Sequence, residues 1–360
     1  MSSKSSVLVT GGSGFVALHV IDTLLSKGYT VVATFRSKEK ADPVLAGFNK
    51  KYSDSIKGRL SYVIVKDITH KEEFDQVFKA DKSIKYVIHT AANFSFGFNK
   101  PLEEVYLNPA RDGALNVLNS IVEYAPQVTN VVVTSSFAAI LNGDKLGDKS
   151  FVHTEETWNP LNWDDPSNNN ENSAYVISKK VAEKASWDFV KEKKPNFQLT
   201  SVNPPFIFGP QLFEDSLKNE TLNTSAEVIN KLLKTTPKDD ETDPEQFSKR
   251  FLLAVDVRDV ALFHVLPLEN SKLEGKREFI AESKFSDQKL LNLINENFPA
   301  LNGKIAKGIP SNIDKLDKNN VYYDSSKTLE LSGVKLIPLK KTIVDSVNQI
   351  LDYKKKHSTS

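Results

Sequence analysis

The chain has 360 residues, of which 39% are hydrophobic and 26% are charged, and its formal net charge is +1. This length exceeds what one hydrophobic core supports, so we expect a main domain with a smaller one attached. No segment approaches the roughly 20 apolar residues of a membrane-spanning helix, and the near-neutral charge gives no reason to expect nucleic acid or an anionic membrane as a partner. Small molecules are therefore the expected ligands.

Cysteine and histidine usage narrows the class further. The chain contains no cysteine, which excludes disulfides and thiolate metal sites, and its six histidines are scattered without a pair at metal-ligand spacing. The sequence therefore predicts no metal. Because no secretory signal precedes the first strand-like run, we expect a soluble protein of the reducing cytoplasm.

The first two hundred residues alternate between short β-rich runs and helical patterns. A run at Ser6–Thr10 is followed by glycines and then by apolar residues at helical spacing over Phe15–Lys27. Continuous apolar runs, rather than alternating ones, predict strands buried on both faces. The further predicted strands are Thr30–Phe35, Leu60–Val65, Tyr86–Thr90, Asn130–Thr134 and Gln198–Val202. Repeated βα units of this kind predict an α/β fold with a doubly wound, parallel Rossmann sheet.

The pattern changes after a proline-rich break at Asn203-Pro-Pro205. Residues from about 210 to 250 are polar, and we expect them to leave the main sheet, whereas Val255–Val260 and Arg277–Ala281 are expected to return to it. The sequence thus predicts a main domain over 1–204 plus about 250–282. Residues of about 205–249 and 283–360 are expected to form a smaller, mostly C-terminal, substrate-binding subdomain.

The glycine-rich turn after the first strand has the setting of a dinucleotide-binding loop. Gly11, Gly14 and Ala17 follow a strand and open a helix. Glycine lets the backbone turn tightly and approach a pyrophosphate, while the helix N-terminus offers unpaired amides. The alternative is an ordinary glycine-rich βα loop, and the flanking strand and helix count against it.

The end of the second strand indicates which dinucleotide is bound. A site for NAD usually has a carboxylate there, but Phe35 is followed by Arg36, with Lys38 and Lys40 close behind. A guanidinium can hold a 2′-phosphate through two charge-assisted hydrogen bonds, so the pattern favours NADPH. A solvated basic loop is the alternative. Asp67 and Ile68 follow the third strand, where a pair of residues could contact adenine or form an ordinary turn.

A tyrosine and a lysine lie four residues apart at the start of a predicted helix over Ala174–Lys193. Tyr175 and Lys179 therefore share one face, where the ammonium would lower the phenol pKa from its usual value near 10. Ser136 follows the fifth strand and could hold a substrate oxygen. The alternative is a pair on the helix surface, but the order glycine loop, serine, tyrosine, lysine favours a catalytic triad.

Taken together, these motifs identify a resemblance that spans nearly the whole chain. Thr10–Ala17, Arg36, His89-Thr-Ala91, Thr134-Ser-Ser136 and Tyr175-Val-Ile-Ser-Lys179 occur in order. Further motifs of the set are Asp67-Ile68, Asn203-Pro204, Phe208-Gly-Pro210, Leu222–Ser225, Val255–Val260 and Asp324–Lys327. The chain resembles the extended short-chain dehydrogenases/reductases, in the branch with plant dihydroflavonol reductases. Within that branch it is most similar to the yeast NADPH-dependent methylglyoxal and aldehyde reductases.

The resemblance implies roles for individual residues. It implies that Ser136, Tyr175 and Lys179 are catalytic. It implies that the cofactor contacts Gly11, Gly12, Ser13, Gly14, Phe15, Val16, Arg36, Lys40, Asp67, Ile68, Thr90, Ala91, Tyr175, Lys179, Pro205, Phe206, Ile207, Phe208 and Ser225. Phe94, Phe137, Asn172 and Phe206 are the expected substrate-pocket residues, although such aromatic residues near strand ends are also common in cores. Phe137 stands where the yeast reductases commonly have tyrosine.

The expected function is NADPH-dependent reduction of small aldehydes and ketones to alcohols, with methylglyoxal-like, branched-aldehyde-like or diketone-like substrates. Two alternatives share some of these motifs. A nucleotide-sugar epimerase or dehydratase would use the same fold and triad, and a non-catalytic NADP(H)-sensing protein would use the cofactor site alone. The sequence leaves a monomer or a homodimer open.

Overall fold

The structure, a computed structural model, describes residues 4–92, 100–165, 168–218, 222–249, 251–313 and 320–357. Its centre is a seven-stranded sheet of order β3-β2-β1-β4-β5-β6-β9, in which every neighbouring pair is parallel. The strands are β1 (Ser6–Thr10), β2 (Thr30–Phe35), β3 (Leu60–Ile64), β4 (Ile84–His89), β5 (Asn130–Thr134), β6 (Gln198–Asn203) and β9 (Arg277–Phe279). The order reverses between β1 and β4, as in Rossmann sheets, so the predicted fold class is confirmed.

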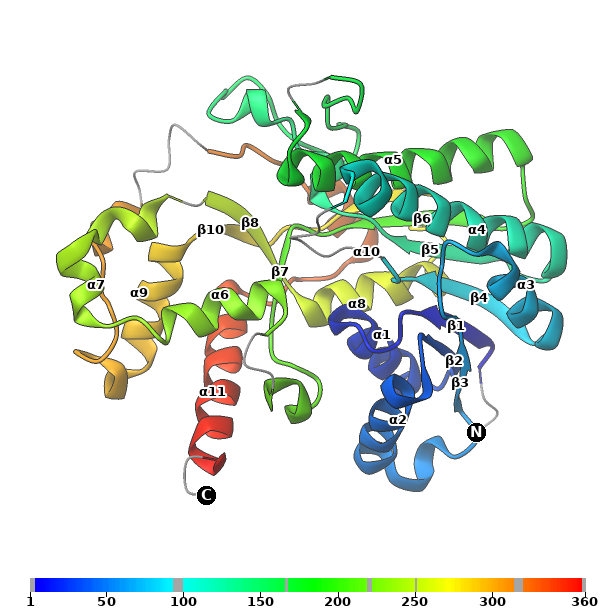
Figure 1. Ribbon diagram of the computed structural model, residues 1–360, viewed down its shortest axis with the longest axis horizontal. Coiled ribbons are helices and arrows are strands. Elements are labelled where there is room, and N and C mark those ends of the chain that lie inside the picture. The colour runs from blue at the N-terminus through cyan, green and yellow to red at the C-terminus, as the bar shows by residue number, and fades with distance from the viewer. Residues whose placement is uncertain are drawn as a thin grey trace.

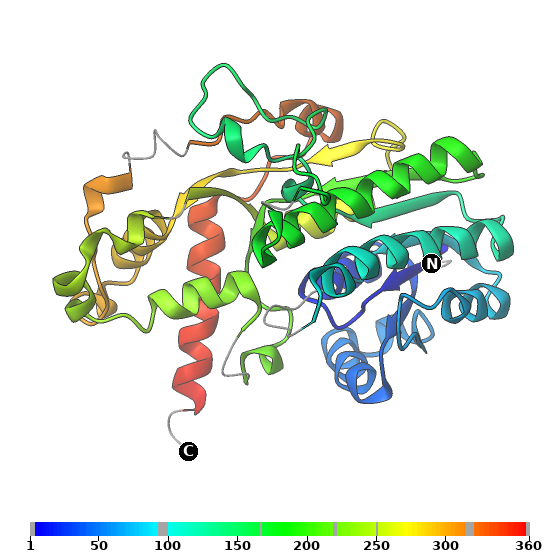
Figure 2. The same ribbon diagram turned by 45° about the horizontal axis from the view of Figure 1, so that its top comes forward.

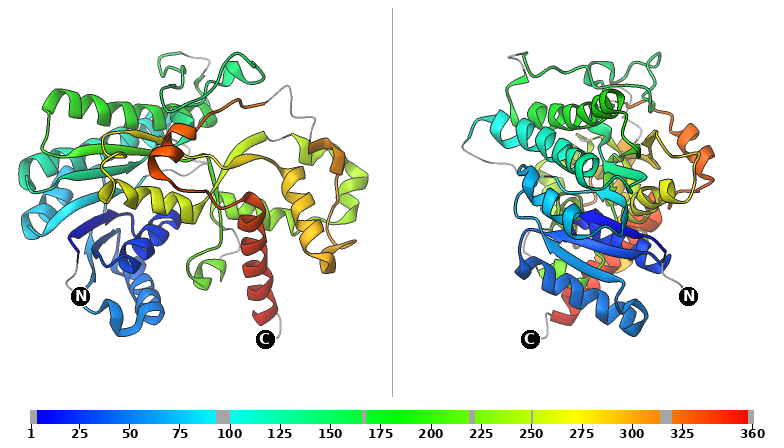
Figure 3. Two further views of the ribbon diagram at one scale, coloured as in Figure 1. Left: turned by 180° about the vertical axis from the view of Figure 1, so that it is seen from behind. Right: turned by 90° about the vertical axis from the view of Figure 1, so that its right-hand side faces the viewer.

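Helices cover both faces of this sheet (Figures 1 and 3). One face is packed by α1 (Phe15–Ser26), α2 (Lys38–Tyr52) and α8 (Val257–Val265). The other is packed by α3 (Lys71–Ala80), α4 (Asn108–Tyr124) and α5 (Glu171–Lys193). This two-sided cover explains why the central strands are continuous apolar runs.

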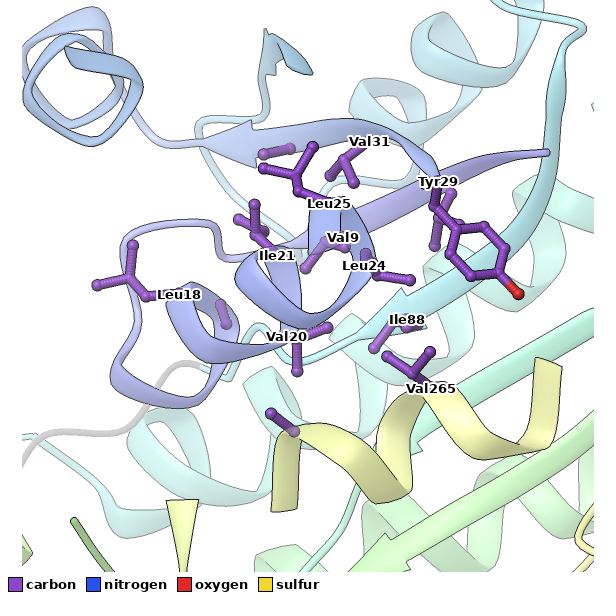
Figure 4. Packing of buried hydrophobic residues seen from close by; sticks show 14 of the residues in the cluster. Val9, Leu18, Val20, Ile21, Leu24, Leu25, Tyr29, Val31, Ile88 and Val265 are labelled. Carbon is purple, nitrogen blue, oxygen red and sulfur yellow. The ribbon is translucent and has the colours of Figure 1, made fainter. Parts of the chain in front are cut away.

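The core beside the glycine loop shows how α1 is held. Figure 4 shows Ile21 and Leu24 of α1 facing Val9 of β1 and Val31 of β2, with Val265 of α8 beside them. All five are fully buried, and burying each side chain stabilises the fold by about 1.5–3 kcal/mol. The helix that follows the loop is therefore fixed firmly against the strand that precedes it.

A second, three-stranded sheet has the order β10-β8-β7 and lies to the left of the main sheet in Figure 1. Its strands are β7 (Phe206–Phe208), β8 (Phe251–Asp256) and β10 (Ser283–Ser286). Three helices, α6 (Thr224–Leu232), α9 (Asp287–Asn297) and α11 (Leu339–His357), enclose an apolar core with it, and α7 (Pro237–Thr242) lies at its outer end (Figure 2). The short helix α10 (Ser326–Ser332) packs beside the main sheet instead.

One sequence expectation about this region was wrong. Val255–Val260 was expected to return to the main sheet, but β8 pairs with β7 and β10 and the chain then turns directly into α8. Asp256 caps that helix by accepting a 2.8 Å hydrogen bond from the Arg258 amide. Arg277–Phe279 does join the main sheet, as predicted, at its edge beside β6. The proposed division into two domains stays a prediction.

No helix within the described ranges combines the length and the apolar character needed to cross a bilayer.

Candidate active site

The loop between β1 and α1 leaves no room for a side chain at Gly11 or Gly12. Gly11 has φ +71°, and a Cβ added there would lie 3.0 Å from the Cα of Ala91. A Cβ on Gly12 would lie 2.8 Å from the ring of Phe35, which is itself buried. The backbone therefore approaches its neighbours as closely as only glycine permits. This bare loop fits the pyrophosphate of a dinucleotide.

The start of α1 is open to a ligand. Its N-cap is Gly14, which offers no side-chain hydrogen bond to the first amides of the helix, and Ser13 and Gly14 are both exposed. Orphan amides and the positive end of the helix dipole favour an anion at such a position. The residues present therefore fit the phosphates of NADPH at this loop.

A buried hydrogen-bond network supports the loop from below. The Thr10 hydroxyl and Nδ1 of His89 are joined by a 2.9 Å hydrogen bond, and the Ala91 amide donates to the same hydroxyl over 3.1 Å. Thr90 donates to the Thr10 carbonyl over 2.5 Å. Burial, together with the nearby charge of Lys179, lowers the pKa of His89 to about 4, so this ring is neutral at physiological pH. The network ties the end of β4 to the end of β1.

The basic residues predicted to select NADPH lie at the end of β2. Arg36 directly follows β2 and Lys40 lies in the first turn of α2, and both are exposed. Asp67 lies after β3 and accepts two hydrogen bonds from Thr69, one from the amide at 2.9 Å and one from the hydroxyl at 2.8 Å. Burial opposes ionisation of Asp67, but these hydrogen bonds lower its pKa overall. The neighbouring Ile68 is buried against Gly113.

The three residues predicted to be catalytic come together at the strand ends. Ser136 follows β5 and caps a short 3₁₀ turn, its hydroxyl accepting a 3.1 Å hydrogen bond from the Ala138 amide. It is also hydrogen-bonded to the hydroxyl of Tyr175 on α5. Lys179, one helical turn further on, has its Nζ 5.7 Å from the centre of the Tyr175 ring. An acid, a hydroxyl and a cation therefore share one small region.

The helix α5 is placed by its sequence. Asn170 caps it by accepting a 3.0 Å hydrogen bond from the Ser173 amide, and Glu171 adds a negative charge to the first turn. The helix therefore begins three residues before the predicted Ala174. This cap puts Tyr175 and Lys179 in the first two turns, near the residues at the end of β5.

The ionisation of the pair differs from the sequence prediction. Lys179 was expected to lower the pKa of Tyr175, but burial raises it, and the hydrogen bond to Ser136 offsets only part of that effect. Burial also lowers the pKa of Lys179 to about 8. The prediction was wrong because it counted the charge of Lys179 and left out the loss of water around both groups. At neutral pH the phenol keeps its proton.

A cavity of about 40 Å³ lies beside Lys179 and extends to His89, Ser135 and Glu183. This volume is far below the roughly 300 Å³ of a typical small-molecule site. Glu183 was not among the predicted site residues. The sequence feature that could have identified Glu183 is its spacing. It follows Lys179 by four residues, which places both side chains on the same face of α5.

The predicted pocket residues differ in how far they are buried in the structure. Phe206 is half-buried and packs 5.5 Å from Phe208, whose side chain is fully buried in the core beneath the second sheet. Phe137 is also buried, stacked 5.1 Å from Phe279. The Phe137 and Phe208 rings therefore belong to the core in this structure. Phe94 lies outside the described residues.

The remaining predicted contacts flank this region. Asn172 is exposed on the first turn of α5, and Pro205 and Ile207 are half-buried around β7. Ser225 is buried at the start of α6, where its hydroxyl accepts a 3.1 Å hydrogen bond from Asn223. Their predicted roles toward cofactor and substrate stay predictions.

Residues 7–280 match the NAD dependent epimerase/dehydratase family, and the chain belongs to that family. It is 39% identical over 356 residues to the NADPH-dependent methylglyoxal reductase of Saccharomyces cerevisiae, covering 97% of this chain and 98% of that protein. The predicted resemblance to extended short-chain dehydrogenases/reductases of the yeast methylglyoxal reductase type is confirmed.

Two solved structures are similar over almost the whole chain. The yeast methylglyoxal/isovaleraldehyde reductase complexed with NADPH superimposes with a TM-score of 0.88 at 37% identity, covering 98% of this chain and 99% of the other. A Candida albicans protein in complex with NADPH gives a TM-score of 0.89 at 38% identity, covering 97% and 99%. A UDP-glucose 4-epimerase of Thermotoga maritima, at 19% identity, shares the fold alone.

Proposed function

We propose that this chain is an NADPH-dependent reductase that converts small aldehydes and ketones to alcohols. The observation that carries the proposal is the hydrogen-bonded pair Ser136 and Tyr175, with Lys179 beside it, at the end of the main sheet nearest the bare glycine loop. The names of the similar proteins, which act on methylglyoxal and isovaleraldehyde, support this substrate class.

Each catalytic side chain has a defined task in this proposal. NADPH supplies the hydride when it is bound. Tyr175 donates its phenolic proton to the carbonyl oxygen, and the Ser136 hydroxyl hydrogen-bonds that oxygen as negative charge develops on it. The Lys179 ammonium stabilises the phenolate that Tyr175 becomes. Burial raises the pKa of Tyr175, so the phenol carries its proton at neutral pH, and the ammonium of Lys179 is needed to offset the cost of losing that proton.

The cofactor contacts of the proposal follow the strand ends. Residues 11–16 hold the pyrophosphate, and Arg36 and Lys40 hold the 2′-phosphate. Asp67 and Ile68 border adenine, and Thr90 and Ala91 border the loop. The proposal further assigns Pro205–Phe208 to the nicotinamide side and Ser225 to the cleft, with Phe206 and Asn172 lining the substrate pocket. The exposure of Arg36 and Lys40 supports their role, since a ligand phosphate can reach them.

Loss of reduced-nicotinamide absorbance tests the proposal. The panel contains methylglyoxal, isovaleraldehyde, an aryl ketone and a diketone, each with NADPH and with NADH. We expect turnover with NADPH, and alcohol formed in equal amount to the NADPH consumed. Tight NADPH binding without oxidation of either cofactor would contradict the proposal and favour an NADP(H)-sensing protein. Conversion of a nucleotide sugar without net NADPH consumption would favour an epimerase.

The proposal also covers the cellular location, the oligomeric state and the cofactor needs of the enzyme. We place it in the cytoplasm as a monomer or homodimer that needs no nucleic acid or metal for activity. Light scattering after gel filtration distinguishes the two oligomeric states, and activity retained after treatment with a chelator checks the metal independence.

A further inference from the structure

Glu183 lies on the same face of α5 as the proposed acid and its cation. It follows Tyr175 by eight residues and Lys179 by four, which corresponds to about two turns and one turn of helix. Its side chain is fully buried, with 0% exposure. A buried carboxylate persists only where hydrogen bonds and an opposite charge replace the water that it has lost.

The Glu183 carboxylate is surrounded by hydrogen-bond donors from several elements of the main sheet. The donating side chains are those of Ser135, Trp187, Ser201, Asn203 and Arg277. Nε of Arg277 lies 2.6 Å from Oε1 and brings the compensating charge from β9. The end of β5, the strand β6 and the edge strand β9 are thereby all fastened to α5.

Two of the donors, Ser135 and Asn203, also connect Glu183 to Ser136, the residue hydrogen-bonded to Tyr175. The hydroxyl of Ser135, adjacent to Ser136 in the chain, donates to Oε2 of Glu183 over 2.5 Å. The amide of Asn203 donates to the same oxygen over 2.7 Å and to the carbonyl of Ser136 over 3.2 Å. Ser136 is therefore held through its neighbour and through its own carbonyl to the helix that carries Tyr175.

From this geometry we infer that Glu183 is a positioning residue for carbonyl reduction, which fixes Ser136 relative to Tyr175 without touching substrate or cofactor. The inference rests on the proposed function. It depends on a carboxylate in particular, because every group around Glu183 is a donor. Glutamine has almost the same shape, but its NH₂ group replaces one carboxylate oxygen. Its N–H groups would then face donors such as the Asn203 amide or the Arg277 guanidinium, which cannot accept them.

The test is Glu183→Gln, assayed with NADPH and the best carbonyl of the panel. A shift of about 1 Å between reacting groups lowers a rate by up to about 100-fold, so we expect kcat to fall about 10- to 100-fold. NADPH affinity, measured by fluorescence titration, should change less than about twofold because the hydrogen bonds of Glu183 go to Ser135, Trp187, Ser201, Asn203 and Arg277 and not to the glycine loop. With NADPH deuterated at the transferred position, the isotope effect on kcat should rise, since misalignment slows the chemical step.

A matched control separates positioning from folding. Asp75 of α3 is also largely buried and accepts 2.6 Å hydrogen bonds from Lys71 and from Ser120 of α4, away from the catalytic residues. Asp75→Asn should lower the thermal stability while kcat and the isotope effect stay those of the wild type. If Glu183→Gln does not fold, Ser135→Ala replaces it, with an expected loss of about 3- to 10-fold in kcat.

The outcomes distinguish the two proposals. A wild-type protein that reduces no carbonyl with NADPH removes the proposed function and this inference together. An active wild type whose Glu183→Gln or Ser135→Ala variant keeps the same kcat, at an equal folded fraction, overturns the inference alone. A variant in which NADPH affinity falls in step with kcat, at an unchanged isotope effect, also overturns it.

Discussion

The two sheets of this protein combine polar and apolar contacts in different ways. At the ends of the main sheet, polar groups of β1, β4, β5 and β6 are joined by short hydrogen bonds, which fix single atoms such as the Thr10 hydroxyl and the Glu183 carboxylate. The second sheet is packed by aromatic rings, with Phe285 4.9 Å from Phe208 and 5.6 Å from Phe206, and Asp256 at the end of β8 also accepts 2.7 Å hydrogen bonds from Arg258 and Thr342. Hydrogen bonds fix direction, whereas apolar burial fixes mainly proximity. The hydrogen bonds nearest the proposed catalytic residues thus lie at the ends of the main sheet, whereas the cluster of Phe206, Phe208 and Phe285 belongs to the second sheet.

The largest expected effect lies in the second sheet. Phe285 is fully buried, so Phe285→Ala should lower the free energy of unfolding by about 3–5 kcal/mol. Urea unfolding at low temperature measures it, with the exposed Val122→Ala as a control that should cost less than about 0.5 kcal/mol. At temperatures where the variant is folded, NADPH affinity should stay within about threefold. A loss of stability below about 1 kcal/mol would show that the aromatic cluster does not hold this sheet.

The next largest effect is expected from a substitution in the glycine loop that follows β1 of the main sheet. Gly12→Ala places a methyl group 2.8 Å from the buried Phe35 ring, and such overpacking costs about 1–3 kcal/mol. The loop must shift, so NADPH affinity should fall by about tenfold or more while the second sheet stays intact. Isothermal titration with NADPH measures the loss. Gly143→Ala is the matched control, because a Cβ at Gly143 meets open space. Equal NADPH affinity in both variants would contradict the assignment of the loop.

A smaller effect is expected on the preference for NADPH over NADH. Arg36→Ala removes the guanidinium at the end of β2, so KM for NADPH should rise about tenfold, which corresponds to about 1.4 kcal/mol, while KM for NADH stays unchanged. The exposed Lys57→Ala serves as a control for loss of positive charge. The role of Arg36 is refuted if KM rises equally for both cofactors.

The smallest effect concerns pH. Because burial lowers the pKa of Lys179 to about 8, its ammonium is present below that pH and is lost as pH rises through it. The value of kcat/KM should therefore fall on the alkaline side, by about a factor of two at pH 8 and tenfold per unit above. Lys179→Arg keeps its charge and should lose this alkaline limb, even if it is slower. An identical limb in wild type and variant would assign the titration to another group.

Local sequence was sufficient for the main sheet but not for the second one. Runs such as Asn130–Thr134 and the glycines after Thr10 carry their structure in a few neighbouring residues, and the observed strands follow them closely. The membership of β8 depends on β7 and β10, which are tens of residues away, so its apolar run alone could not tell the two sheets apart.

The features of the candidate site also separate into those that local sequence predicts and those that depend on distant segments. The spacing of Tyr175 and Lys179 is a local property, and the structure has both on one face of α5 as expected. The direction of the Tyr175 pKa depends on burial by distant segments, which a spacing does not contain. The partners of Glu183 range from Ser135 to Arg277, so no short motif could reveal that network.

The most direct test of the account is single-turnover NADPH oxidation by wild type and by Tyr175→Phe, which removes one hydroxyl from the proposed proton donor. The rate should fall about 10² to 10⁴-fold while NADPH binds as tightly as before. A Tyr175→Phe variant that oxidises NADPH within about threefold of the wild-type rate would contradict the central claim that Tyr175 supplies the proton.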